Sequence, residues 1–153
     1  MATIRNKITP FLWFDNQAEE AAKFYISIFK NSKLGKVMPG PDGRVMGLSF
    51  TLDGQEFRAL NGGPQFKFSP AISFFVDCKT QKEVDELWEK LSAGGEKQPC
   101  GWLKDRYGVS WQIIPTVLGK LLADKDRRKA QKVMQAMLQM QKLDIKGLEA
   151  AYG

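Results

Sequence analysis

The hydrophobic and polar positions of the first 62 residues predict a strand, a helix and then three more strands. The first apolar run ends at Asp15, and apolar residues at helical spacing follow it. Asn16 and Glu19 fit a capping box that would start this helix. Later in the segment, Asp53-Gly54 separates two alternating runs, as in a tight hairpin. These elements fall at residues 7–14, 16–31, 33–38 and 45–60.

The same order of elements then repeats. An apolar strand over 71–76 ends at Asp77, and Thr80 with Glu83 fits a second capping box. Shorter strand patterns follow the second helix at 97–100, 102–105 and 109–114. The offset from Asp15 to Asp77 is 62 residues, which indicates a duplicated βαβββ unit. The pattern predicts an α+β fold, with paired βαβββ modules at about 7–62 and 70–115 forming a single domain over 1–115.

The remaining residues, 116–153, predict a C-terminal helical extension. Val133, Met137 and Met140 lie at helical spacing and form an apolar stripe with Ala130 and Met134. Such a stripe fits packing on the chain's own domain, and it also fits packing against a second subunit.

Composition excludes several classes of chemistry. The chain has no histidine, so no Ser-His-Asp triad, Cys-His dyad or histidine zinc site is possible. Cys78 and Cys100 cannot form a four-thiolate zinc site, and two cysteines favour a reducing cytoplasm. The start, Met1 to Lys7, lacks the apolar core of a signal peptide, and no run approaches the roughly 20 apolar residues of a membrane span.

The net charge of +6 is concentrated in the extension. Residues 1–115 carry 15 basic and 13 acidic side chains, and residues 116–153 carry 8 and 4. No aromatic residue alternates with the basic cluster around Arg127 and Arg128, so we interpret it as a solvated helix face. We therefore expect neither a nucleic-acid partner nor a membrane partner.

Several long motifs carry a family resemblance. They are Ile8-Thr9-Pro10-Phe11-Leu12-Trp13-Phe14-Asp15, Phe24-Tyr25, residues 60–68 with Asn61-Gly62-Gly63-Pro64, residues 100–112 from Cys100-Gly101-Trp102 to Gln112, and residues 133–140. Together with the duplicated unit, they resemble the PhnB-like branch of the vicinal oxygen chelate superfamily. That superfamily includes glyoxalase, bleomycin-resistance proteins and dioxygenases, and this branch often carries the label 3-demethylubiquinone-9 3-methyltransferase.

The resemblance also implies where a metal would bind. Enzymes of the superfamily hold a divalent metal with two His and one or two carboxylates. Those ligand positions fall on Ile8, Asn61, Ala71 and Gln112. Aliphatic side chains cannot ligate a metal, and neutral amides are weak donors. We expect no metal site and no cofactor.

Other reactive groups have ordinary structural interpretations. Asp105-Arg106 fits turn chemistry, and Glu56 with Arg58 on one strand face fits a surface ion pair. Cys78 fits a core position. Cys100 fits an unreactive half-buried thiol, although Lys97 or Lys104 nearby leaves a reactive thiolate open.

The concave sheet then remains as the site. By strand alternation we expect ten residues to point into an apolar cup with a few amides and hydroxyls, as in small-molecule sites. They are Leu12, Phe14, Phe57, Ala59, Asn61, Ser73, Phe75, Ser110, Gln112 and Ile114.

These features predict a cytoplasmic small-molecule-binding protein, or a metal-independent enzyme of unknown reaction. The resemblance, together with the apolar stripe, implies a homodimer. One alternative is a metal-dependent lyase, isomerase or dioxygenase with an altered site, which the absence of histidine disfavours. The other is the ubiquinone-pathway methyltransferase of the family label. No Gly-x-Gly-x-Gly turn for S-adenosylmethionine occurs in the chain.

Overall fold

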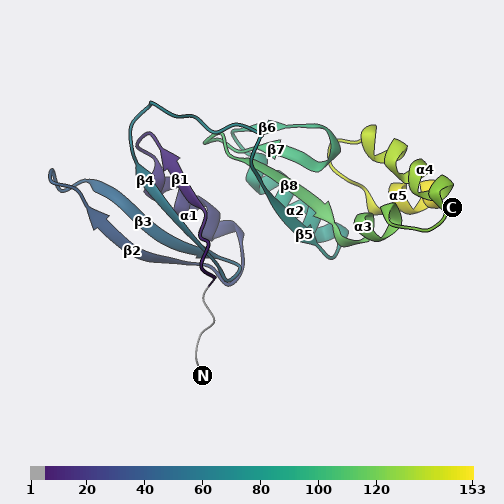
Figure 1. Cartoon of the computed structure of the whole chain (residues 1–153), viewed down its shortest axis with the longest axis horizontal. Helices are drawn as coiled ribbons and strands as arrows, with labels where there is room; N and C mark the ends of the chain where they lie inside the picture. Colours follow the sequence, from purple (N-terminus) through teal and green to yellow (C-terminus); the bar gives the residue numbers. More distant parts are fainter. Residues whose placement is uncertain (1–5) are drawn as a thin grey trace, which may run out of the picture. The chain divides into compact units, whose positions relative to one another are not determined.

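The computed structural model describes residues 6–153, so the prediction about the start of the chain at Met1 lies partly outside the described residues. The chain divides into two units: unit 1 ends at Lys67, and unit 2 runs from Phe68 to Gly153. Each unit has a four-stranded sheet with one helix between its first two strands (Figure 1). The predicted α+β fold of paired βαβββ modules with a helical tail is confirmed.

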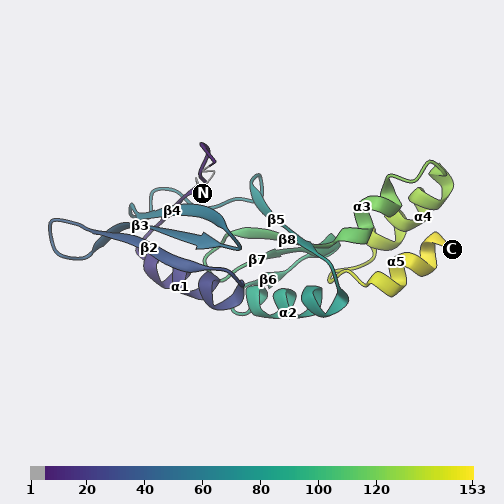
Figure 2. The ribbon, with the colours of Figure 1, turned by 90° about the horizontal axis from the view of Figure 1, so that it is seen from below.

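Unit 1 is a mixed sheet covered by a helix on one face (Figure 2). Its elements are β1 (Phe11–Phe14), α1 (Ala18–Ile28), β2 (Lys33–Pro39), β3 (Val45–Leu52) and β4 (Gln55–Asn61). The strand order is β1-β4-β3-β2, with β1 parallel to β4 and the other pairs antiparallel. Tyr25 of α1 lies over Phe50 of β3, with ring centroids 6.3 Å apart, and both are buried. This contact fixes which sheet face is the core.

The hairpin turn of unit 1 is as predicted. Asp53 and Gly54 both have positive φ, 47° and 81°, which is the type I′ geometry that joins twisted antiparallel strands.

The predicted capping box at Asn16 is wrong. The N-cap of α1 is Gln17, and no side chain at that position caps the helix. The side chain of Asn61 performs this role from β4: its Oδ1 accepts a hydrogen bond from the backbone N of Ala18 at 2.9 Å. A local pattern could not reveal a cap supplied from 43 residues away.

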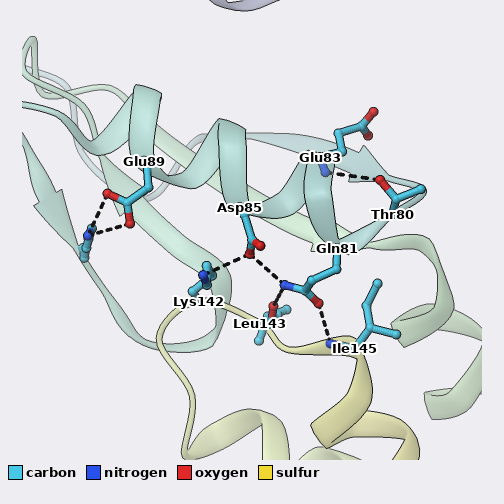
Figure 3. Close-up of polar contacts among 9 residues, drawn as sticks. Thr80, Gln81, Glu83, Asp85, Glu89, Lys142, Leu143 and Ile145 are labelled. Atoms are coloured by element: carbon cyan, nitrogen blue, oxygen red, sulfur yellow. Dashed lines mark hydrogen bonds and ion pairs between the residues drawn. The ribbon is translucent and has the colours of Figure 1, made fainter.

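Unit 2 repeats this arrangement. Its elements before the tail are β5 (Ser73–Cys78), α2 (Gln81–Ser92), β6 (Glu96–Lys97), the 3-10 helix η1 (Pro99–Gly101), β7 (Trp102–Lys104) and β8 (Ser110–Pro115), in sheet order β5-β8-β7-β6. Here the predicted cap is confirmed, because the Thr80 hydroxyl accepts from the backbone N of Glu83 at 3.2 Å (Figure 3).

The turn between β7 and β8 is organised by Asp105, as the turn interpretation predicted. Its buried carboxylate accepts from the backbone N of Tyr107 at 2.8 Å and of Val109 at 3.1 Å, and from Trp111 Nε1 at 2.9 Å. Three donors on one carboxylate hold the turn and a core indole together.

The tail forms three helices that pack on unit 2 of the same chain. They are α3 (Thr116–Leu122), α4 (Arg127–Leu138) and α5 (Ile145–Tyr152). Their apolar side chains surround the end of β8 in one cluster, whose buried members are Ile114, Leu118, Val133, Leu143 and Leu148. Met137 and Met140 pack against this cluster. Val133, Met137 and Met140 of the stripe therefore pack on their own chain, whereas Met134 is 40% exposed.

Polar contacts fasten the tail to α2, as Figure 3 shows. Gln81 donates from Nε2 to the carbonyl of Leu143 at 3.0 Å, and its Oε1 accepts from the backbone N of Ile145 at 2.7 Å. Asp85 accepts from Gln81 Nε2 at 3.0 Å and pairs with Lys142 at 2.9 Å. The hydrogen bonds from Gln81 and then Lys142 lower the pKa of the Asp85 carboxyl. Residues 142–145 are thus held by one glutamine and one ion pair.

Candidate functional site

The second sheet has one face packed on α2 and one face without a covering helix along most of its length. Trp111 and Ile113 of β8 and Leu103 of β7 are buried on the α2 side. Alternation places their neighbours on the opposite side. Strand register arranges these neighbours in two rows, Ser73–Ser110–Lys104 and Phe75–Gln112–Trp102. We call these six residues the open face of unit 2.

Polar groups occupy the centre of the open face. Gln112 Nε2 donates to Ser73 Oγ at 2.9 Å, which leaves the Ser73 hydroxyl hydrogen available for an outside acceptor. Among the described residues, Ser110 Oγ is the buried side-chain polar atom without a hydrogen-bond partner, and Ser110 is 1% exposed. An unpaired buried hydroxyl costs about 1–3 kcal/mol, so its retention requires a reason.

Aromatic side chains flank these polar groups. Phe75 lies opposite Gln112 in register on one side and Trp102 on the other. Phe75 is 60% exposed, and Trp102 is half-buried. Apolar surface around a few hydrogen-bonding groups is the usual composition of a small-molecule site.

Charged side chains lie at both ends of the face: Lys104, with the exposed Glu96 of β6 beside it in register, at one end and Asp77 at the other. Lys104 is half-buried, and no ion pair holds it within residues 6–153. The next lysine in the sheet, Lys97, lies on the α2 side and pairs with Glu89 at 3.0 Å. At the opposite end, the carboxylate of Asp77 accepts from Thr116 Oγ1 at 2.9 Å.

Four predicted cavity residues lie on the wrong face. Leu12, Phe14, Phe57 and Ala59 are all buried on the face that α1 covers. Phe57 shows this directly, because it stacks on Phe50 at 5.3 Å, and Phe50 in turn contacts Tyr25 of α1. A shift of one residue moves every side chain of a strand to the other face. The repeat offset of 62 residues identifies the uncovered face of β1, because Phe11 and Trp13 correspond to Ser73 and Phe75 of β5.

Asn61 also points to the α1 side. Its Oδ1 caps α1, and its Nδ2 donates to the carbonyl of Val45 at 3.0 Å. Asn61 borders a hollow of about 760 Å³ that also includes Asn16 and Arg44. Both ends of its amide are committed to the backbone, so we assign it a structural role.

Ile114 is covered rather than open. It follows Gln112 by alternation on the same face, but the tail cluster buries it to 6% exposure. Of the ten predicted residues, Ser73, Phe75, Ser110 and Gln112 lie together on one open face. Trp102 and Lys104 complete it; sequence analysis missed both, although their alternation with Leu103 gave the signal.

Unit 1 has an open face of a different character. Phe11 and Trp13 lie on it, opposite Arg58 and Leu60 of β4. Trp13 Nε1 donates to the carbonyl of Gly63 at 2.9 Å, and Phe66 meets its ring edge-on at 4.9 Å. The predicted ion pair of Arg58 and Glu56 forms at 3.8 Å. This face is dominated by aromatic and apolar side chains.

The residues at the superfamily's metal positions do not fit a metal. Ile8 is 85% exposed ahead of β1, and Ala71 is exposed ahead of β5. Asn61 caps a helix and Gln112 binds Ser73, as described above. Within residues 6–153, no three His, Cys, Asp or Glu side chains gather where they could hold an ion.

The two cysteines differ in their surroundings. Cys78 is fully buried in unit 2, and desolvation, with Glu83 and Asp77 nearby, raises the pKa of its thiol to about 12. A thiol with this pKa stays protonated at neutral pH and is inert. Cys100 is half-buried in η1, with φ of 64°.

Comparison with known proteins assigns the chain to a family. The paired βαβββ modules define a glyoxalase-like fold, and a family model described as 3-demethylubiquinone-9 3-methyltransferase matches residues 6–114. The chain therefore belongs to that family, in the PhnB-like branch of the vicinal oxygen chelate superfamily. A search of curated proteins found no match.

Solved structures of other proteins have a similar fold. A PhnB protein from Bacillus cereus is 37% identical with a TM-score of 0.68, and the match covers 72% of this chain and 99% of that one. A protein from Pseudomonas aeruginosa is 19% identical with a TM-score of 0.62, covering 72% and 98%. The fosfomycin resistance protein FosX from Listeria monocytogenes, solved with Mn(II) and sulfate, is 18% identical with a TM-score of 0.52, covering 71% and 90%.

The family match ends before the tail. It stops at residue 114, so the segment 133–140 lies beyond it, although that segment was part of the expected resemblance. None of the helices within residues 6–153 has the length and hydrophobicity needed to cross a bilayer.

Proposed function

We propose that the chain binds a small molecule on the open face of unit 2, without a metal ion. The observation that carries this proposal is the buried, unpartnered Ser110 hydroxyl beside the Ser73–Gln112 hydrogen bond. Flanking aromatic residues, Phe75 and Trp102, supply apolar surface for a ligand.

The alternatives have less support. A metal-dependent lyase, isomerase or dioxygenase would need ligands that the chain's amides and aliphatic residues do not supply. A methyltransferase that binds S-adenosylmethionine on a doubly wound sheet would need a different topology, because each sheet here is mixed and four-stranded.

We propose further that the protein is a cytoplasmic homodimer. Ile8, Phe11 and Phe66 of unit 1 are 85%, 57% and 65% exposed, and exposed apolar side chains of this size favour association. Both cysteines are free thiols, which suits a reducing compartment. Sedimentation at micromolar concentration tests the assembly: a 17.3 kDa species would reject the dimer.

We propose no nucleic-acid and no membrane partner. Two of the tail's cations are engaged within the chain: Lys129 lies 4.7 Å from the Tyr152 ring centroid, and Lys142 pairs with Asp85. The tail should therefore give no mobility shift with DNA or RNA at physiological salt, and no pelleting with anionic vesicles.

A thermal-shift screen of small metabolites tests the binding site. Compounds that raise the melting temperature of the natural chain should lose that effect in Gln112→Ala. The matched control is Gln135→Ala, an exposed glutamine on α4 away from the open face. Equal shifts in both variants, or a requirement for added metal, would reject the proposal.

A further inference from the structure

We infer that the ligand of this face is a small anion with a single planar ring, such as an aromatic carboxylate. This inference rests on the proposed function and specifies the ligand's chemistry. It follows from three features of the open face: the position of its one lysine, the spacing of its aromatic residues, and the tail that closes one end.

Three polar groups at one end can donate hydrogen bonds, and their row ends at the exposed Glu96 of β6, which lies beside Lys104 in register without an ion pair between them in the described chain. Lys104 lies beside Ser110 in register, with Ser73 on the other side. The Lys104 ammonium and the Ser73 hydroxyl can donate to an anion, and charge-assisted hydrogen bonds are the stronger kind. The Ser110 hydroxyl lies between them in register and is 1% exposed, so it can join them only when its neighbours part to admit a ligand oxygen. Because Ser73 already accepts from Gln112, its hydrogen is left to point toward a ligand oxygen.

The opposite end of the face carries an acidic side chain, and neither row has a cation there. Asp77 lies four residues beyond Ser73 on β5, which is roughly 13 Å along a strand. Its carboxylate would repel an anion. The anionic group is therefore directed to the Lys104 end, and this fixes the ligand's orientation.

The row between these ends fits one ring. Neighbouring strands lie about 4.8 Å apart, so Phe75 and Trp102 stand about 10 Å from each other across Gln112. A six-membered ring over Gln112 would contact both aromatic side chains and the amide. Beyond this row the tail cluster covers Ile114, so a second ring in line has no open surface.

Four probes separate the contributions of charge and ring. Benzoate carries both, benzamide and benzylammonium change the charge, and acetate lacks the ring. The readout is fluorine NMR of protein labelled with 5-fluorotryptophan. Trp102 reports on the open face, and the buried Trp88 and Trp111 together with Trp13 of unit 1 are internal controls.

Benzoate should shift the signal of Trp102 and of no other tryptophan. Benzamide and acetate should bind about tenfold more weakly than benzoate, because each lacks one contribution: a charge-assisted hydrogen bond or a stacked ring. Lys104→Gln should reduce benzoate affinity about tenfold, to the level of benzamide. Lys97→Gln, which removes a cation on the other sheet face, should change nothing.

Two results would overturn the inference. Benzamide or benzylammonium binding as tightly as benzoate at Trp102 would reject the anionic class and leave the site itself standing. No shift of the Trp102 signal with any probe would also reject an aromatic carboxylate as the ligand class. The proposed function is tested separately: it fails if the thermal-shift screen finds no compound whose effect depends on Gln112.

Discussion

Replacing Ser110 with alanine should make the free protein more stable and its ligand complex weaker. The hydroxyl is 1% exposed and has no hydrogen-bond partner within the described chain. Removing an unsatisfied buried hydroxyl recovers part of its desolvation cost of about 1–3 kcal/mol. We expect the free energy of unfolding to rise by about 1 kcal/mol, because alanine keeps the backbone and leaves little empty volume.

The ligand removes this difference in stability. Benzoate at ten times its dissociation constant stabilises the natural chain by about 1.4 kcal/mol. If Ser110 donates to the carboxylate, the variant binds about tenfold more weakly, and the same benzoate concentration adds only about 0.4 kcal/mol. The two proteins should therefore be nearly equal in stability with benzoate present.

Urea unfolding followed by tryptophan fluorescence measures both states. A Trp13→Phe background restricts the signal to Trp88, Trp102 and Trp111, which all lie in unit 2. A variant less stable than its parent by more than 1 kcal/mol would show that the Ser110 hydroxyl is paired in the folded protein. A stabilised variant that keeps the full benzoate effect would place the ligand elsewhere.

The other predictions concern the tail and the thiols. Met137→Lys should lower the stability of unit 2 by about 1–2 kcal/mol without changing the sedimentation coefficient, because the stripe packs on its own chain; a dissociated dimer would contradict this. Gln81→Ala should speed hydrogen exchange at the Ile145 amide and cost roughly 2 kcal/mol, since that donor and the Leu143 carbonyl both lose their partner; unchanged exchange would refute it. Iodoacetamide at pH 8 should modify Cys100 and spare Cys78, whose pKa is about 12. The folded state keeps the Cys78 thiol neutral, whereas the unfolded chain ionises it with a pKa near 9.0. The free energy of unfolding should therefore fall as the pH rises from 9 to 12. A free energy of unfolding that stays constant over this range in denaturant titrations would contradict the raised pKa.

The sequence predicted the order of elements because local signals were strong. Both modules, the Asp53-Gly54 turn and the Thr80 cap depend on residues close in the chain. The start of α1 was missed because its cap, Asn61, comes from a distant strand.

Only part of the candidate site could be predicted from the sequence. In unit 2 the polar residues Ser73 and Gln112 marked the open face, but in unit 1 both faces of β1 are apolar, and alternation alone could not choose between them. Applying the 62-residue repeat strictly would have selected Phe11 and Trp13. The contribution of Lys104 was hidden in a three-residue strand, and the packing of the tail on Ile114 depended on tertiary contacts.

A crystal structure of the full chain grown with benzoate would show where the ligand binds. We expect ring density over Gln112, between Phe75 and Trp102, with the carboxylate toward Lys104 and no metal beside it. Density on another surface with this face empty, or a metal ion coordinated by Gln112, would contradict it.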